Sequence, residues 1–263
     1  MLKSKSCTDR RVSPWWWVST LYFAQGLPYV AVMTISVIMY KRLGISNTDI
    51  ALYTSWLYLP WVIKPFWSPV VDLFRTKRWW IVMMELLIGI GFAGVAFTIP
   101  ATFFFQATLA VFWIIAFVSA THDIAADGYY MLALSEHDQS FYVGIRSTFY
   151  RISTIVGQGL LVMLAGYIEN KNDTLAPGES MDYTPVAWMT VMGVLSVFFI
   201  IISVYHRFIL PRTASDRPAE GVTLRNVGKE FLSTFTSFFK KPGIGVAIAF
   251  MLLYRFPEAQ LVK

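Results

Sequence analysis

The sequence predicts an all-α membrane protein. Of its 263 residues, 56% are hydrophobic and only 14% are charged, whereas a soluble domain carries about 25% charged residues. The apolar residues gather in runs of about 20 or more, the length that a helix needs to cross a bilayer. The net charge of +6 does not indicate a nucleic-acid partner, because the basic residues stand in short segments between the apolar runs.

Six apolar segments are long enough to span a membrane. They cover residues 15–40, 50–74, 79–99, 102–134, 142–168 and 185–205. A seventh apolar run begins near Gly243 and continues to Lys263, where the sequence stops without a closing loop. We therefore expect a chain that is cut inside or just after a seventh helix.

Four parts follow from this pattern. We expect a basic cytoplasmic tail at 1–14, a six-helix half at 15–206, a cytoplasmic connector at 207–241 and the start of a seventh span at 242–263. Within the connector, five apolar residues fall on one helical face, which predicts either an amphipathic helix on the inner membrane surface or a short soluble helix packed on the bundle. These five residues are Leu224, Val227, Phe231, Phe235 and Phe238.

The distribution of basic residues predicts the orientation. With a cytoplasmic N-terminus, the inner segments hold fourteen lysines and arginines, and the outer loops hold three, namely Lys41, Arg42 and Lys171. Cytoplasmic loops carry the excess of basic residues in membrane proteins, so we expect the N-terminus inside. Six spans, a long basic connector and a seventh span are the layout of one half of a twelve-helix secondary transporter.

The single cysteine, Cys7, lies in the tail, so no internal disulfide and no metal framework is indicated. The apolar run behind the tail is too long for a cleaved signal peptide. The sequence indicates no cofactor. A transporter of this layout would interact with a small solute and with the lipid bilayer.

Ionisable residues inside the spans are costly, at roughly 2.5–3.5 kcal/mol each on insertion scales. At about 1.5 Å of rise per residue, all of those in this chain fall in the cytoplasmic half of the membrane. We expect them to form a neutral layer shared by at least four helices. They are Lys64, Glu85, Asp123, Asp127, Arg146 and Arg151.

Antiparallel packing of the fourth and fifth spans would bring Asp123 level with Arg151, and Asp127 level with Arg146 or one turn from it. One interpretation is a set of fixed salt bridges that lock the bundle. The other gives Asp123 a role in proton coupling, because a carboxylate beside a cation in low dielectric has two nearly balanced states and its protonation can bias a conformational equilibrium. The neighbouring His122 is either a hydrogen-bonded interior residue or a proton relay, since no further metal ligand is near.

Three polar or aromatic residues are candidates for the wall of a solute cavity. Gln25 and Tyr29 flank the Gly-Leu-Pro sequence in the first span, and a buried amide at such a break indicates either a cavity wall or a packing kink. Tyr150 is an aromatic that could stack on a sugar ring. Ser153 and Gly157 form a small-x-x-x-small pair, which is typical of close helix packing.

Several stretches together resemble the AmpG-type anhydromuropeptide permease family of the major facilitator superfamily, which is related to acetyl-CoA transporters. The resemblance covers roughly residues 15–166. The matching stretches are FAQGLP at 23–28, KPFWSPVVD at 64–72, DIAAD at 123–127 and YR at 150–151. The final YRFPE at 254–258 resembles the seventh helix of this family.

The resemblance implies a proton-coupled symporter that imports a cell-wall-derived solute across the bacterial inner membrane by alternating access, with a second six-helix half. It also implies that Lys64, Asp123, Asp127 and Arg151 match buried charged positions of the family. Related permeases for sugars or acyl-CoA compounds, and a non-transporting signalling component, remain alternatives. A membrane-embedded enzyme is disfavoured because the sequence offers neither a nucleophile nor a metal site.

A further motif joins the second and third spans. Asp72 with Arg75, Lys77 and Arg78 resembles an inner-loop motif of the superfamily in which an aspartate and bases form a gate latch. Pro69 stands where glycine is common in that motif, so the resemblance is carried mainly by the aspartate.

Overall fold

The computed structural model describes residues 12–170 and 182–217, together with 233, 236–237, 239–250 and 253. The chain divides into two compact units, Met1–Pro218 and Ala219–Lys263, and each is described by itself. Every regular element among the described residues is helical. The prediction of an all-α protein is therefore confirmed.

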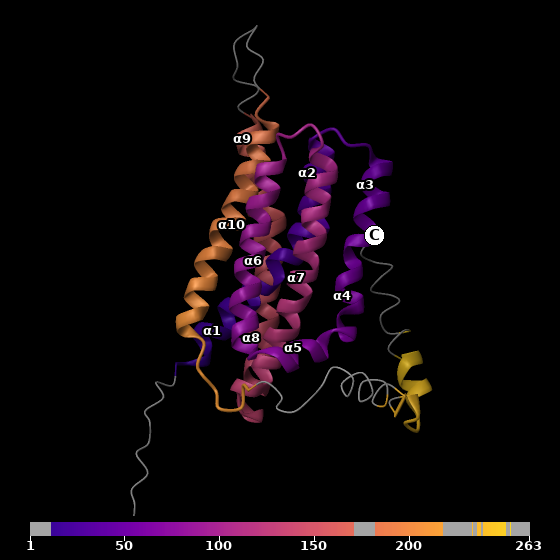
Figure 1. Cartoon of the computed structure of the whole chain (residues 1–263), viewed down its shortest axis with the longest axis vertical. Coiled ribbons are helices and arrows are strands. Elements are labelled where there is room, and N and C mark those ends of the chain that lie inside the picture. The colour runs from indigo at the N-terminus through magenta and orange to yellow at the C-terminus, as the bar shows by residue number, and fades with distance from the viewer. Residues whose placement is uncertain are drawn as a thin grey trace, which may run out of the picture. The chain divides into compact units, whose positions relative to one another are not determined.

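Five stretches of the first unit are long and apolar enough to cross a membrane, and they stand side by side in Figure 1. Together they make the chain a multi-pass membrane protein. The first stretch combines α1 (Pro14–Val30), the π-helical η1 (Ala31–Ile35) and α2 (Ser36–Arg42); the next two are α6 (Lys77–Thr98) and α7 (Phe104–Ala133). The fourth combines α8 (Glu136–Ile155), the π-helical η4 (Val156–Leu161) and α9 (Val162–Glu169), and the fifth is α10 (Thr184–Ile209).

The second predicted span needs a correction, because it is not one continuous helix. It consists of α3 (Asn47–Thr54), η2 (Ser55–Tyr58), α4 (Leu59–Ile63), η3 (Lys64–Phe66) and α5 (Ser68–Phe74). Pro60, Pro65 and Pro69 each stand at the first or second position of a segment. A proline lacks the N–H group and clashes with the preceding turn, so each one ends a helix and starts the next. In Figure 1 these segments descend beside the bundle, and α5 turns across its lower end.

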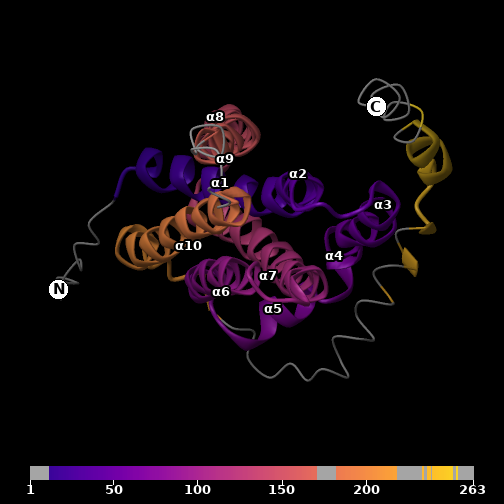
Figure 2. The same cartoon turned by 90° about the horizontal axis from the view of Figure 1, so that it is seen from above.

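α1 is the central helix of the first unit. It contacts α7, α8 and α10, while α6 lies along both α7 and α10 (Figure 2). In the most apolar part of the stretch Pro14–Arg42, 67% of the residues are buried, against 28% in Glu136–Glu169. Side chains of α1 therefore face the interior, whereas α8 and α9 leave much of their surface uncovered.

Small residues bring α1 and α8 close together, as the spacing of Ser153 and Gly157 predicts. A Cβ atom on Gly26 would lie 2.0 Å from Ser153 Oγ, and one on Gly157 would lie 2.7 Å from Val30 Cγ1. The two π-helical segments, η1 and η4, also contact each other just beyond this crossing. π-Helical turns are rare in proteins, and those that occur often lie at functional sites. The contact between η1 and η4 therefore marks this crossing as a site of altered helix geometry.

Two apolar clusters fill the core of the first unit, and buried polar residues separate them. On α6, Glu85 falls between Ile81 of one cluster and Ile88 of the other. On α10, His206 falls between Ile202 and Leu210 in the same way. The interior therefore contains a polar layer between two apolar ones, at a similar level on neighbouring helices.

In the second unit, residues 244–250 are helical and follow Gly243, whose φ is 81°. These residues belong to the stretch 242–263, for which the seventh span stays a prediction. The basic tail 1–11, the five residues of the predicted amphipathic helix and the stretch 254–258 lie outside the described residues.

Candidate functional site

The first pair in the polar layer joins the broken second span to α7. Lys64 Nζ lies 3.7 Å from Asp123 Oδ2, and 35% of the Lys64 side chain and 11% of the Asp123 side chain are exposed. The side-chain amide of Gln25 faces the same carboxylate. A separation of 3.7 Å is longer than a hydrogen bond, so the two charges attract each other without a direct bond.

The second pair is tighter and lies one helical turn away on α7. Arg146 donates to Asp127 Oδ1 at 2.9 Å, and the Tyr22 hydroxyl donates to the same oxygen at 3.1 Å. The guanidinium also lies 4.5 Å from the centroid of the Tyr22 ring and 5.7 Å from that of Tyr130. Charge-assisted hydrogen bonds and cation–π contacts reinforce each other here, so this group fastens α1, α7 and α8 together.

Glu85 does not join these pairs, in contrast to the expectation of one shared charge layer. Its Oε1 atom lies 2.6 Å from His206 Nδ1 and 3.3 Å from His122 Nε2. All three side chains are at most 1% exposed. Depth along the helix is similar for all these groups, but Glu85 points from α6 toward α7 and α10 rather than toward Lys64.

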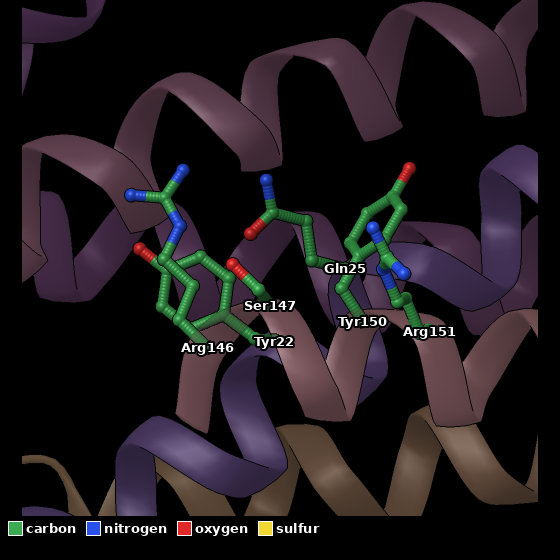
Figure 3. Close-up of a pocket in the computed structure, with 6 residues that line it drawn as sticks. All are labelled: Tyr22, Gln25, Arg146, Ser147, Tyr150 and Arg151. Atoms are coloured by element: carbon green, nitrogen blue, oxygen red, sulfur yellow. The ribbon is translucent and has the colours of Figure 1, made fainter. Parts of the chain in front are cut away.

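Arg151 also departs from the expected pairing. It is exposed and forms no ion pair with any residue of the described ranges. It instead lines an open pocket of about 340 Å³ between α1 and α8 (Figure 3). The residues that line this pocket are Tyr22, Gln25, Arg146, Ser147, Tyr150 and Arg151.

The three cavity candidates separate into two groups. Gln25 and Tyr150 line the pocket of Figure 3, and Tyr150 interacts electrostatically with Asp123. Tyr29 is absent from its lining and packs edge-on against Trp61 and Tyr58, with ring centroids 5.2 and 6.4 Å away. Tyr29 therefore ties α1 to the broken second span.

The bases of the inner-loop motif contact the end of α10 and the residues after it. Arg78 Nε donates to the Leu210 carbonyl at 3.0 Å, and a second nitrogen of the guanidinium donates to the Arg207 carbonyl. The carboxylate of Asp216 accepts hydrogen bonds from the backbone N–H groups of Lys77, at 2.6 Å, and Arg78, at 3.0 Å. These contacts satisfy the free ends of two helices at once, the N–H groups of α6 and the carbonyls of α10.

Arg75 and Asp72 are the other two members of this motif. Arg75 places its guanidinium 5.7 Å from the Trp79 ring. Asp72 belongs to the last turn of α5, and its side chain lies outside the described residues.

Sequence reasoning missed His206, Thr20 and Asp216. The predicted sixth span ends at residue 205, so His206 falls at the very end of the predicted six-helix half, one residue beyond that span. The spacing of Phe199, Ile202 and His206 could have indicated that His206 is buried, because the three residues share one face of α10. No local pattern indicates Asp216, since its partners lie 138 and 139 residues earlier in the chain.

The sequence profile of the Major Facilitator Superfamily matches residues 18–259. The chain therefore belongs to this superfamily.

Curated relatives agree with this assignment. The anhydromuropeptide permease of Escherichia coli K12 is 30% identical over 158 residues, which are 55% of this chain and 30% of that protein. The transporter AmpG 4 of Rickettsia conorii is 22% identical over 260 residues, which are 92% of this chain and 56% of that protein. The chain thus spans between about a third and about half of the length of these relatives.

Proposed function

We propose that this chain is the N-terminal half of a proton-coupled symporter. The symporter would import a cell-wall-derived solute of the anhydromuropeptide class across the bacterial inner membrane by alternating access, with its N-terminus in the cytoplasm. The observation that carries the proposal is the Lys64–Asp123 pair, two opposite charges 3.7 Å apart and without a direct hydrogen bond.

Such a pair suits proton coupling for a physical reason. An ionised Asp123 attracts Lys64, whereas a protonated Asp123 does not, so one proton changes the free-energy balance between an arrangement with the pair closed and one with it open. Lys64 stands on η3, a three-residue segment between breaks in the second span. Short segments separated by prolines can shift relative to α7 without breaking a long helix.

The pocket between α1 and α8 supports the class of solute. It offers the cations of Arg146 and Arg151, the aromatic rings of Tyr22 and Tyr150 and the amide of Gln25. Muropeptides combine sugar rings with carboxylates, and guanidinium groups bind carboxylates well. The volume of about 340 Å³ lies at the lower end of the range for small-molecule sites, about 300–1,000 Å³, so the second half would complete the cavity. The name of the Escherichia coli relative favours the same solute.

Uptake into membrane vesicles tests this function. Vesicles that contain the chain with the second six-helix half should accumulate labelled anhydromuropeptide, and a protonophore should collapse the accumulation. Vesicles that hold only the 263 residues should not accumulate it. Uptake that survives the protonophore would refute proton coupling. Competition by a sugar or acetyl-CoA in place of muropeptide would refute the solute class. Failure to accumulate any of these solutes would favour the signalling alternative.

A further inference from the structure

The two cations in the pocket between α1 and α8 have different surroundings. Arg146 donates to Asp127 at 2.9 Å and lies 4.5 Å from the centroid of the Tyr22 ring. Arg151 stands five residues later on α8, about 7.5 Å further along the helix axis. It is exposed and forms no ion pair and no hydrogen bond with any residue that the structure describes. The charge of Arg146 is therefore balanced within the described chain, whereas the charge of Arg151 is not.

One side of the pocket has already used its polar groups. The Tyr22 hydroxyl donates to Asp127 at 3.1 Å, and the Ser147 hydroxyl donates to a backbone carbonyl of α8 at 3.0 Å. Figure 3 shows Arg146 and Tyr22 on this side and Arg151 on the opposite side. Because the charge and the hydroxyl hydrogens on this side already bind other groups of the protein, an anionic solute would be attracted only weakly to it.

The other side of the pocket has polar groups left for a ligand. Gln25, which lies between the two sides in Figure 3, is 6% exposed, and its Oε1 atom has no hydrogen-bond partner among the described residues. The amide of Gln25 faces the Asp123 carboxylate. Because an ionised carboxylate only accepts hydrogen bonds, the amide nitrogen is directed to Asp123 and the oxygen remains free. Buried polar atoms without a partner are rare, and an N–H or O–H group of a solute beside Arg151 would supply the missing donor.

We propose that Arg151 binds a carboxylate of the transported solute and so selects anionic solutes, whereas Arg146 holds α1, α7 and α8 together. The identity of this solute rests on the function proposed above. A guanidinium group binds a carboxylate through two parallel hydrogen bonds, and no carboxylate of the described residues pairs with Arg151. The ring of Tyr150, which lines the same pocket, offers a flat surface to the rest of the solute. Arg151 then takes part in solute binding rather than in the charge layer expected from the sequence.

Equilibrium binding to the purified protein, with both six-helix halves present, tests this role. The two probes are labelled anhydromuropeptide with free carboxylates and the same compound with every carboxylate converted to an amide. We expect a roughly 10- to 100-fold higher Kd for the amide form, because it loses a hydrogen bond to a charged group. In Arg151→Gln the Kd of the carboxylate form should rise by the same factor, so that the two forms bind alike. Arg151→Lys keeps the charge without the paired donors and should give an intermediate ratio.

Two further arginine variants serve as controls. Arg146→Gln should lower the unfolding temperature, because Asp127 loses its partner, but it should preserve the ratio of the two Kd values. Arg217→Gln, at an exposed position after α10, should change neither quantity. Damage to the fold in Arg151→Gln would weaken the binding of both forms equally, so the ratio separates a lost contact from a lost structure. If Arg151→Gln does not fold, the ratios in the wild type and in Arg151→Lys still decide.

Four results would overturn the proposal: equal Kd values of the two forms in the wild type, an undiminished ratio in Arg151→Gln or Arg151→Lys, a ratio lost in Arg146→Gln, or no binding of the carboxylate form. These measurements need no proton gradient. Uptake that proved independent of protons would refute the coupling and leave the role of Arg151 standing. Proton-driven accumulation of both forms alike would keep the symporter and remove that role.

Discussion

The ammonium group of Lys64 lies 3.7 Å from the carboxylate of Asp123. One turn along the same helix, Asp127 is bonded to Arg146 at 2.9 Å and to Tyr22 at 3.1 Å. The two aspartates therefore have different surroundings. Asp127 is held by directional bonds from two other helices, whereas Asp123 faces its cation, Lys64, without a direct bond, and we expect only Asp123 to change its charged partner during transport.

Replacement of Asp123 by asparagine should abolish proton-driven accumulation, because the side chain can no longer release and bind a proton. Exchange of solute across the membrane without a gradient should persist, since the asparagine keeps the size of the side chain. Accumulation and exchange are compared in the same vesicles. Asp49→Asn, at an exposed position of α3, is the matched control, and normal accumulation by Asp123→Asn would exclude the coupling role.

Lys64→Ala should lower the free energy of unfolding, because it leaves Asp123 without its cation. The loss should fall between the value for an exposed pair, about 1 kcal/mol, and that for removing one partner of a buried pair, about 3 kcal/mol. Thermal unfolding in detergent measures it. Adding Asp123→Asn should restore most of the lost free energy of unfolding. Adding Asp127→Asn should not, because Asp127 is paired with Arg146. Strictly additive losses in the first double variant would argue against the pairing.

Gly157→Ala should destabilise the crossing of α1 and α8, because the new Cβ would lie 2.7 Å from Val30 Cγ1. Overpacking of this kind costs about 1–3 kcal/mol, and Val30→Ala in the same chain should relieve it. Gly159→Ala in the same π-helical segment is the control, since a Cβ there meets nothing within 4 Å. Equal unfolding temperatures of the two alanine variants would show that the close contact is not maintained in the membrane.

The orientation can be tested with the single native cysteine. Cys7 precedes the first span, so a membrane-impermeant maleimide should label it in inside-out vesicles but not in intact spheroplasts. Thr102→Cys in a Cys7→Ser chain, at an exposed turn between α6 and α7, should show the opposite pattern. Labelling of Cys7 from outside would reverse the topology.

The sequence predicts the long helices well, because the length of an apolar run directly reflects the thickness of the bilayer. It predicts the second span less well, because the overall apolar character of residues 50–74 does not show that each of the three prolines ends one helical segment and starts the next. Depth along a helix can also be read from sequence, and it brings Asp127 level with Arg146. The direction in which a side chain points around the helix axis cannot be read so easily, and it is this direction that brings Glu85 to the two histidines.

The bonds between Asp216 and the first turn of α6 impose an order on the assembly of this protein. Asp216 follows Lys77 by 139 residues, and a ribosome that adds about 5–20 residues per second supplies it on the order of ten seconds later. During that delay the amide groups at the start of α6 must be hydrated by water at the membrane surface. This end of the bundle can close only after α10 has been inserted and the chain has turned back to bring Asp216 to the start of α6.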